Sequence, residues 1–164
     1  MLVLMLMRHA QAVSPFDAER DHSRDLSEFG KIQTTHQARL FLPQKSDALL
    51  VSDANRTRQT AQGLLSTWSD MDTLHLPPAH ITETAYLADA PTLMELVRMA
   101  PSHVKRLWLI AHNPGISEFA AMLTQSYISM GTANIAEVHL SIDQWLDIHS
   151  GAGHLASHHL SQRP

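Results

Sequence analysis

The sequence predicts a three-layer α/β/α sandwich with a mainly parallel central sheet and an antiparallel edge. Three short apolar runs, at 1–7, 48–51 and 106–111, each lead toward a segment with helical character. Apolar runs without alternation are typical of parallel strands that are buried on both faces. A later stretch, at 136–143, alternates apolar and polar residues, as a half-exposed antiparallel strand does. Strands that alternate with helices build a parallel sheet covered by helices.

Helix-capping residues and prolines mark where the elements begin and end. Ser27, Asp89 and Asn113 can each accept a hydrogen bond from the first turn of a following helix. Pro43 and Pro101 end helices that precede them. In chain order we expect a strand at 1–7, a helix at 27–42, a strand at 48–51, a helix at 55–65, a short strand at 81–87, a helix at 89–100, a strand at 106–111, a helix at 113–123, and a hairpin of strands at 136–143 and 145–149.

Length and composition indicate one domain without a nucleic-acid or membrane partner. The 164 residues carry a formal net charge of −4 and contain no cysteine. No basic stripe suggests a nucleic-acid partner, and no apolar stretch reaches the roughly 18 residues of a membrane span. The lack of cysteine makes a cytoplasmic location the expectation. We expect a single domain over residues 1–150 and a loose, His-rich C-terminal tail over 151–164.

Each of the three apolar strands is followed by polar residues of similar kinds. They are, in chain order, Arg8 and His9, Ser52 and Arg56, and His112 and Asn113. The carboxyl ends of parallel strands meet at one edge of an α/β sheet, where ligands usually bind. Arginine binds phosphate oxygens bidentately, and helix N-termini add free N–H donors. The sequence therefore predicts an anion site at this edge.

Two histidines give such a site a reaction as well as a ligand. A neutral imidazole nitrogen can attack phosphorus and form a phosphohistidine, which water then hydrolyses. Surrounding positive charge lowers the pKa of a histidine and keeps its ring neutral near pH 7. The same charge stabilises the phosphoryl transition state. We therefore expect phosphoryl-transfer chemistry that uses no metal and no other cofactor.

Four motifs resemble those of the histidine phosphatase superfamily, which includes the phosphoglycerate mutases. Residues 8–10 resemble its Arg-His-Gly signature, and residues 52–61 resemble its Ser-Pro-x-x-Arg-Ala-x-Gln-Thr-Ala motif. Residues 111–114 are similar to its later histidine motif. Residues 24–30 resemble the Arg-Pro-Leu-Thr-x-x-Gly stretch of its SixA-type branch. The resemblance covers nearly the whole chain and implies a phosphoglycerate mutase-like fold.

The resemblance also implies roles for the residues at the strand ends. His9 is the nucleophile that it implies. The implied ligands of the phosphoryl group are Arg8, Arg56 and His112, with Asn113 and Ser52 as further candidates.

A general acid is the role with several candidates. Larger family members use a carboxylic acid to protonate the leaving oxygen, and Glu83, Asp89 and Asp21 are candidates here, with Glu83 slightly favoured. Asp21 belongs to a polar segment at 10–24, which is either a solvated loop or a flap with Asp21 or Arg24 reaching inward. A phosphohistidine substrate relaxes the need for an acid, because imidazole leaves more readily than an alkoxide.

The function that the resemblance implies is a phosphohistidine phosphatase of the SixA type. Its partner would be a protein that carries phosphohistidine, such as a histidine phosphotransfer domain or a phosphocarrier. One alternative is a phosphatase or mutase that acts on small phosphomonoesters. Another is a pseudoenzyme that binds phosphorylated partners, because Ala10 and Asp53 replace a glycine and a proline of the family motifs. Ala10 would be strained if the backbone there needs a positive φ.

Overall fold

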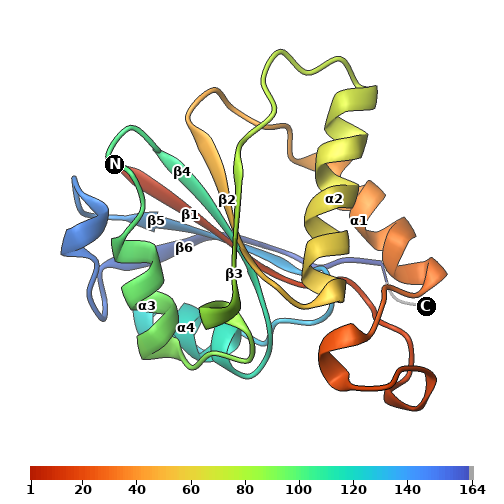
Figure 1. The fold of residues 1–164 in the computed structure, drawn as a ribbon. Helices are drawn as coiled ribbons and strands as arrows, with labels where there is room; N and C mark the ends of the chain where they lie inside the picture. The colour runs from red at the N-terminus through yellow and green to blue at the C-terminus, as the bar shows by residue number, and fades with distance from the viewer. Residues whose placement is uncertain (163–164) are drawn as a thin grey trace.

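The computed structural model describes residues 1–162 and contains one six-stranded mixed sheet with helices on both faces (Figure 1). The strands are β1 (Leu2–Arg8), β2 (Asp47–Ser52), β3 (Ala79–Thr82), β4 (Arg106–Ala111), β5 (Ile135–Leu140) and β6 (Gly153–His159). The strand order is β3-β2-β4-β1-β5-β6. The first four of these pair in parallel, and β5 and β6 pair antiparallel. The mainly parallel sheet with an antiparallel edge is confirmed.

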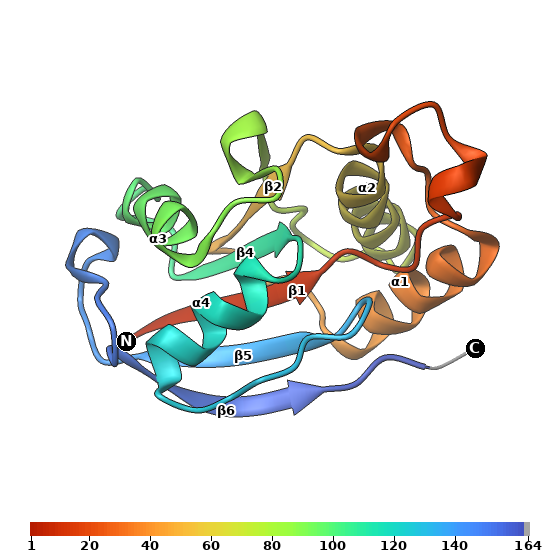
Figure 2. The same ribbon diagram turned by 90° about the horizontal axis from the view of Figure 1, so that it is seen from below.

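Four α-helices form the outer layers. They are α1 (Glu28–Leu40), α2 (Asn55–Asp70), α3 (Ala90–Arg98) and α4 (Gly115–Thr124). The pair α1 and α2 packs on one face of the sheet, and the pair α3 and α4 packs on the other (Figures 1 and 2). None of the helices in residues 1–162 has the length and apolar character needed to cross a bilayer.

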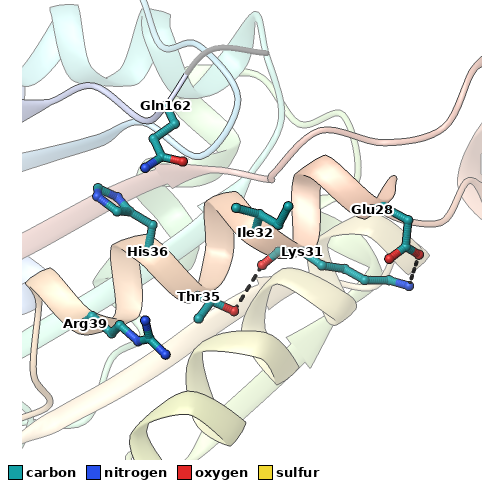
Figure 3. Close-up of a pocket in the computed structure, with 7 residues that line it drawn as sticks. All are labelled: Glu28, Lys31, Ile32, Thr35, His36, Arg39 and Gln162. Carbon is teal, nitrogen blue, oxygen red and sulfur yellow. Dashed lines mark hydrogen bonds and ion pairs between the residues drawn. The ribbon is translucent and has the colours of Figure 1, made fainter.

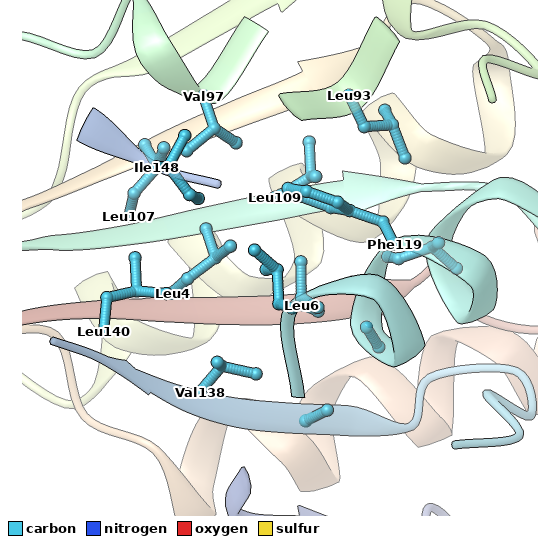
Figure 4. Close-up of a cluster of buried hydrophobic side chains, with 14 of the residues drawn as sticks. Leu4, Leu6, Leu93, Val97, Leu107, Leu109, Phe119, Val138, Leu140 and Ile148 are labelled. Carbon is cyan, nitrogen blue, oxygen red and sulfur yellow. The ribbon is translucent and has the colours of Figure 1, made fainter. Parts of the chain in front are cut away.

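Strand β1 lies in the middle of the sheet and contributes to both hydrophobic layers. Leu4 and Leu6 point toward α3 and α4 (Figure 4), and Leu2 belongs to the same hydrophobic cluster. Met5 and Met7 point toward α1 and α2. All five side chains are at most 1% exposed, and each contributes about 1.5–3 kcal/mol through burial. Burial on both faces explains the unbroken apolar run and fixes the place where Arg8 leaves the core.

Capping residues start two of the helices as predicted. The side chains of Ser27 and Asp89 each accept a hydrogen bond from the backbone N–H three residues later, at the beginning of α1 and α3. The prediction for Asn113 is wrong, because Pro114 occupies the N-cap position of α4. The side chain of Asn113 is instead hydrogen-bonded to the carbonyl of Met130 and to the hydroxyl of Ser117.

The predicted strand at 81–87 lies too late in the sequence. Strand β3 ends at Thr82, and Glu83–Ala85 forms a 3₁₀ turn. The Thr82 hydroxyl accepts a hydrogen bond from the backbone N–H of Thr84, which turns the chain away from the sheet. The helix predicted at 55–65 is also longer and continues to Asp70.

The returning strand of the C-terminal hairpin was predicted at the wrong place. Trp145–Asp147 is a 3₁₀ turn, in which the buried indole of Trp145 donates to the carbonyl of Val104. The strand that pairs with β5 is β6, which lies within the predicted loose tail at 151–164. Because β6 lies at the edge of the sheet and its side chains are exposed or half-buried, its sequence is polar and resembles that of a tail. Arg163 and Pro164, the end of the predicted tail, lie outside the described residues.

Candidate active site

The carboxyl ends of β1, β2 and β4 are neighbours in the sheet and bring predicted site residues together. The backbone N–H of His9 donates to the carbonyl of Ala111 at the end of β4 (3.1 Å). His112 follows directly, and the centroids of the His9 and His112 rings are 5.3 Å apart. Arg56, in the first turn of α2, has its Nε 3.3 Å from Nε2 of His9. His9, Arg56 and His112 therefore form one cluster.

Hydrogen bonds define which nitrogen of His9 can act as a nucleophile. Nδ1 lies 2.8 Å from the carbonyl oxygen of Ala10. Because a carbonyl oxygen only accepts hydrogen bonds, this contact assigns the proton of the neutral ring to Nδ1. Nε2 then carries the lone pair, and it accepts the hydrogen bond from Arg56 Nε. The unprotonated nitrogen of His9 thus faces the guanidinium group.

Burial and positive charge keep both imidazoles neutral. Burial lowers the pKa of His9 to about 3; the hydrogen bond to Ala10 opposes this change, and the charges of Arg56 and Arg8 add to it. Burial also lowers the pKa of His112 to about 3, together with the nearby His9 and Arg56. A neutral ring is the form that attacks phosphorus. Both side chains are buried, with 7% of His9 and 2% of His112 exposed.

Arg56 is held from two directions. Its Nη1 donates to the backbone carbonyl of Asp21 (2.7 Å), and its Nη2 donates to Oδ2 of the same residue (2.9 Å). Its Nε points to His9, and only 2% of the residue is exposed. One edge of the planar guanidinium is therefore fixed by Asp21, while the Nε side faces the nucleophile.

Two buried polar atoms in this cluster lack a hydrogen-bond partner among residues 1–162. They are Nε of Arg8 and Nδ1 of His112. The other end of each side chain is anchored: Arg8 Nη1 donates to the carbonyl of Met130 (3.2 Å), and His112 Nε2 lies 2.7 Å from the hydroxyl oxygen of Ser52. A buried polar atom without a partner costs about 1–3 kcal/mol.

The flap, which we define as residues 10–26, crosses the N-terminal end of α2. Oδ1 of Asp25 accepts hydrogen bonds from the side-chain amides of Asn55 (3.0 Å) and Gln59 (2.8 Å). The guanidinium of Arg24 donates to the carbonyl of Val13 and to Asp21. The segment therefore has both expected characters: it brings Asp21 to Arg56, and its residues 14–17 and 19–21 are exposed to solvent.

The three candidate acids occupy different environments. Partial burial alone would raise the pKa of Asp21, but hydrogen bonds from Tyr86, Arg56 and Arg24 hold this pKa well below its usual range. The carboxylate of Asp89 caps α3, and hydrogen bonds at Thr92 lower its pKa. Glu83 is exposed in its 3₁₀ turn. Of these three carboxylates, the described contacts bring Asp21 to the arginine and histidine cluster.

Tyr86 and Thr60 belong to the site and were not predicted. The ring of Tyr86 lies perpendicular to that of His112, with centroids 5.5 Å apart, and its hydroxyl donates to Oδ2 of Asp21 (2.7 Å). The hydroxyl oxygen of Thr60 accepts the backbone N–H of Ala10 (3.0 Å). Thr60 lies inside the second sequence motif, which could have indicated it. Tyr86 lies in a segment that was predicted to be a strand, so no sequence signal marked it.

The two departures from the family motifs are accommodated. The backbone of Ala10 lies outside the left-handed region, and its side chain is fully buried. The expected strain therefore does not arise. The carboxylate of Asp53 pairs with Nε2 of His22 from the flap at 3.0 Å.

Histidines of the predicted tail lie on β6. The ring of His159 packs edge-on against Phe41 (4.6 Å between centroids), and the ring of His154 packs against His139 (5.4 Å). Within the part of the chain that the structure describes, no group of three or more His, Asp or Glu residues is arranged to hold a metal ion.

Comparisons with known proteins agree with this geometry. The model of the histidine phosphatase superfamily (branch 1) matches residues 4–84. An uncharacterized chloroplastic protein of Arabidopsis thaliana is 29% identical, over 87% of this chain and 68% of that one. A protein of Nakamurella multipartitia named as phosphohistidine phosphatase SixA has a TM-score of 0.78, with 22% identity over 99% of this chain and 96% of that chain. The tungstate complex of the protein histidine phosphatase SixA has a TM-score of 0.73, with 20% identity over 96% of each chain.

These matches have two consequences. The structural likeness extends over nearly the whole chain and confirms the phosphoglycerate mutase-like fold. The sequence match covers the segment from β1 to the turn after β3, which holds His9, Arg56 and the flap. Residues 4–84 therefore match the histidine phosphatase superfamily, and nearly the whole chain shares the fold of the SixA proteins.

Proposed function

We propose that the protein is a SixA-type phosphohistidine phosphatase, which removes phosphate from a histidine of a partner protein through a phosphohistidine at His9. Nε2 of His9 attacks the phosphorus of the substrate and forms a new P–N bond. The P–N bond to the substrate imidazole breaks, and its electron pair stays on that nitrogen, which takes up a proton. Water then attacks the phosphohistidine of the enzyme and releases inorganic phosphate and free His9.

The observation that carries this proposal is that the contacts of Asp21 favour the ionised form of its side chain. A general acid must hold a proton, whereas the hydrogen bonds from Tyr86, Arg56 and Arg24 stabilise Asp21 as a carboxylate. An alkoxide leaving group needs a positioned acid. An imidazole has an ordinary pKa near 6.5 and can take its proton near neutral pH. A negative charge beside the site also stabilises a leaving imidazolium ion, which favours P–N over P–O cleavage.

The arginines supply the positive charge that the phosphoryl group requires. Arg8 and Arg56 would neutralise its oxygens, and His112 would be a further ligand. Ser52 would support the ring of His112, and Asn113 would support the loop that contains Met130. The reaction therefore needs no metal in this proposal. A chelator such as EDTA is expected to leave turnover within twofold of its untreated value, and loss of activity that Mg²⁺ or Zn²⁺ restores would contradict this.

The short segments around His9 favour a substrate carried on a protein. The connection from β3 to α3 spans residues 83–89, and that from β4 to α4 spans 112–114, so the flap is the longest segment beside the nucleophile. A histidine on the surface of a phosphotransfer domain or phosphocarrier could approach such a site. The lack of cysteine keeps a cytoplasmic location as part of the proposal.

The test compares a phosphohistidine-bearing carrier protein with a panel of sugar phosphates and other phosphomonoesters. We expect turnover of the carrier, a covalent phosphohistidine trapped at His9, and loss of both in His9→Ala. The matched control is His80→Ala, because His80 is exposed on β3. Turnover of the phosphomonoesters alone would replace the proposal with a small-molecule phosphatase. Binding of the carrier without hydrolysis would replace it with a pseudoenzyme, although the geometry of Ala10 and Asp53 weakens that alternative.

A further inference from the structure

Two buried glutamines of α1 face the catalytic end of β1. Gln33 is 2% exposed and Gln37 is fully buried, and they lie one helical turn apart on the same side of the helix. A buried amide is costly unless its polar atoms are hydrogen-bonded. Both polar atoms of the Gln33 amide have hydrogen-bond partners, whereas Gln37 has one for its Nε2 and, among residues 1–162, none for its Oε1.

Gln37 reaches the nucleophile through a single residue. Its Nε2 donates to the carbonyl of Ala133 (2.7 Å). The backbone N–H of Ala133 donates in turn to the carbonyls of Arg8 and His9, both at 3.1 Å. Gln37 therefore binds the carbonyl of Ala133, and the N–H of the same residue binds the backbone of Arg8 and His9.

Ala133 has a backbone conformation that needs such support. Its φ is +55°, in the left-handed region that alanine rarely adopts, and the residue is fully buried. Strained backbone persists where the surrounding contacts fix it, and it is often found at functional sites. The donor from Gln37 and the acceptors at Arg8 and His9 fix Ala133 from both sides.

Gln33 anchors the other flank of His9. Its Oε1 accepts the backbone N–H of Gln11 (2.9 Å), two residues after the nucleophile. Its Nε2 donates to the hydroxyl of Ser161 (2.9 Å) and to the carbonyl of Gln162 (3.0 Å). The chain on each side of His9 is thus bonded to α1.

Residues on the outer face of α1 provide positions for control substitutions. An open cavity of about 400 Å³ on this face is lined by Ile32, Thr35, His36 and other side chains of the helix, together with Gln162. Figure 3 shows these side chains. The hydroxyl of Thr35 donates to the helix carbonyl of Lys31 (3.2 Å) and takes no part in the contacts around His9.

We propose that Gln33 and Gln37 are positioning residues, which fix the backbone on both sides of His9 and thereby the direction in which its Nε2 attacks phosphorus. This inference rests on the proposed function of His9. Phosphoryl transfer depends on a near-linear approach of the nucleophile, and a misplacement of about 1 Å can lower the rate about 100-fold. Arg56, His112 and the guanidinium of Arg8 are each held by side-chain contacts that do not involve the two glutamines, so we expect binding of a free anion to be independent of them.

The test replaces Gln37 with methionine, which has a similar volume and no N–H donor. With phosphoramidate as substrate, we expect kcat to fall about tenfold or more in Gln37→Met. The inhibition constant of inorganic phosphate should stay within twofold. The double variant Gln37→Met/Ala133→Gly tests the role of the backbone strain. Because glycine adopts a positive φ without a hydrogen bond from Gln37, most of the lost kcat should return in this variant. Gln62→Met on the exposed face of α2 and Thr35→Ala should leave kcat unchanged.

A kcat of Gln37→Met within twofold of the wild-type value would overturn the inference. A parallel loss of phosphate binding would also overturn it, because that result means general damage to the site. Hydrogen exchange at the Ala133 amide adds a readout that needs no turnover, and we expect exchange in Gln37→Met to be at least about tenfold faster. Unchanged exchange would overturn the inference, whereas an inactive wild-type enzyme would overturn the proposed function instead.

Discussion

Asp21 and Arg56 are joined at two points, one through the backbone carbonyl of Asp21 and one through its carboxylate, at 2.7 and 2.9 Å. The two residues come from different elements, because Asp21 lies in the flap and Arg56 lies in the first turn of α2. The pair therefore couples the position of the flap to the orientation of the guanidinium that faces His9. Tyr86 adds a third element, since its hydroxyl donates to the same carboxylate oxygen.

Replacing Asp21 with asparagine tests whether this residue orients Arg56 or acts as an acid. The substitution removes the charge but keeps the size, and a lost charge-assisted hydrogen bond of about 1.5 kcal/mol lowers kcat/KM about tenfold. We expect this decrease with a phosphohistidine carrier and an unchanged shape of the pH–rate profile. Asp17→Asn, at an exposed position of the same flap, is the control. Disappearance of one limb of the pH profile in Asp21→Asn would identify Asp21 as a general acid instead.

The cluster of His9, Arg56 and His112 could be predicted because it depends on few properties of the chain. Apolar runs without alternation identify central parallel strands, and the carboxyl ends of such strands meet at one edge of the sheet. The contacts of Asp21 and Tyr86 could not be predicted in the same way. They depend on the path of the flap and on the 3₁₀ turn after β3, where local hydrogen bonds rather than periodicity determine the conformation.

Strand β6 shows the opposite case, in which composition was misleading. Gly153–His159 is polar and rich in histidine, and most of its side chains are exposed or half-buried. Its place in the sheet comes from backbone pairing with β5, which a polar sequence does not reveal. Trp145 was predicted to begin the returning strand of the hairpin at 145–149, yet it fills the core from a 3₁₀ turn.

The low pKa values of His9 and His112 predict that stability decreases in mild acid. Each pKa is about 3 in the folded protein and near 6.5 in the unfolded chain, so the unfolded state binds more protons between these values. The stabilisation is complete above pH 6.5 and is lost as the pH falls toward 3. Each ring contributes up to about 1.4 kcal/mol per pH unit within this window.

Urea unfolding at pH 7.5 and pH 5.5 measures this dependence. We expect a smaller difference between the two pH values in His112→Gln than in the wild type. His80→Gln, at an exposed position, should show the wild-type difference. An equal difference in all three proteins would mean that the buried imidazole of His112 does not carry the effect.

Tyr86 offers a way to separate a hydrogen bond from an aromatic contact. Tyr86→Phe removes the donor to Asp21 but keeps the ring that lies 5.5 Å from His112. A hydrogen bond to a charged acceptor contributes about 1.5 kcal/mol or more, so we expect kcat/KM to fall about tenfold. Tyr86→Ala also removes the ring and should lower kcat/KM further. Tyr127→Phe, at a residue that is 87% exposed, serves as the control. Equal activities of Tyr86→Phe and Tyr86→Ala would show that the ring makes no contribution.

Ala10→Gly restores the residue that the family motif has beside the nucleophile. Ala10 is fully buried, has no positive φ, and donates its N–H to Thr60, so glycine relieves no strain here. Glycine instead adds backbone freedom to the unfolded chain, which lowers the free energy of unfolding by about 0.4–1 kcal/mol. We expect this loss in urea unfolding, with kcat/KM within twofold of the wild-type value. A clear gain in both stability and kcat/KM would mean that alanine distorts the backbone at His9, and it would make position 10 the cause of reduced activity in this chain.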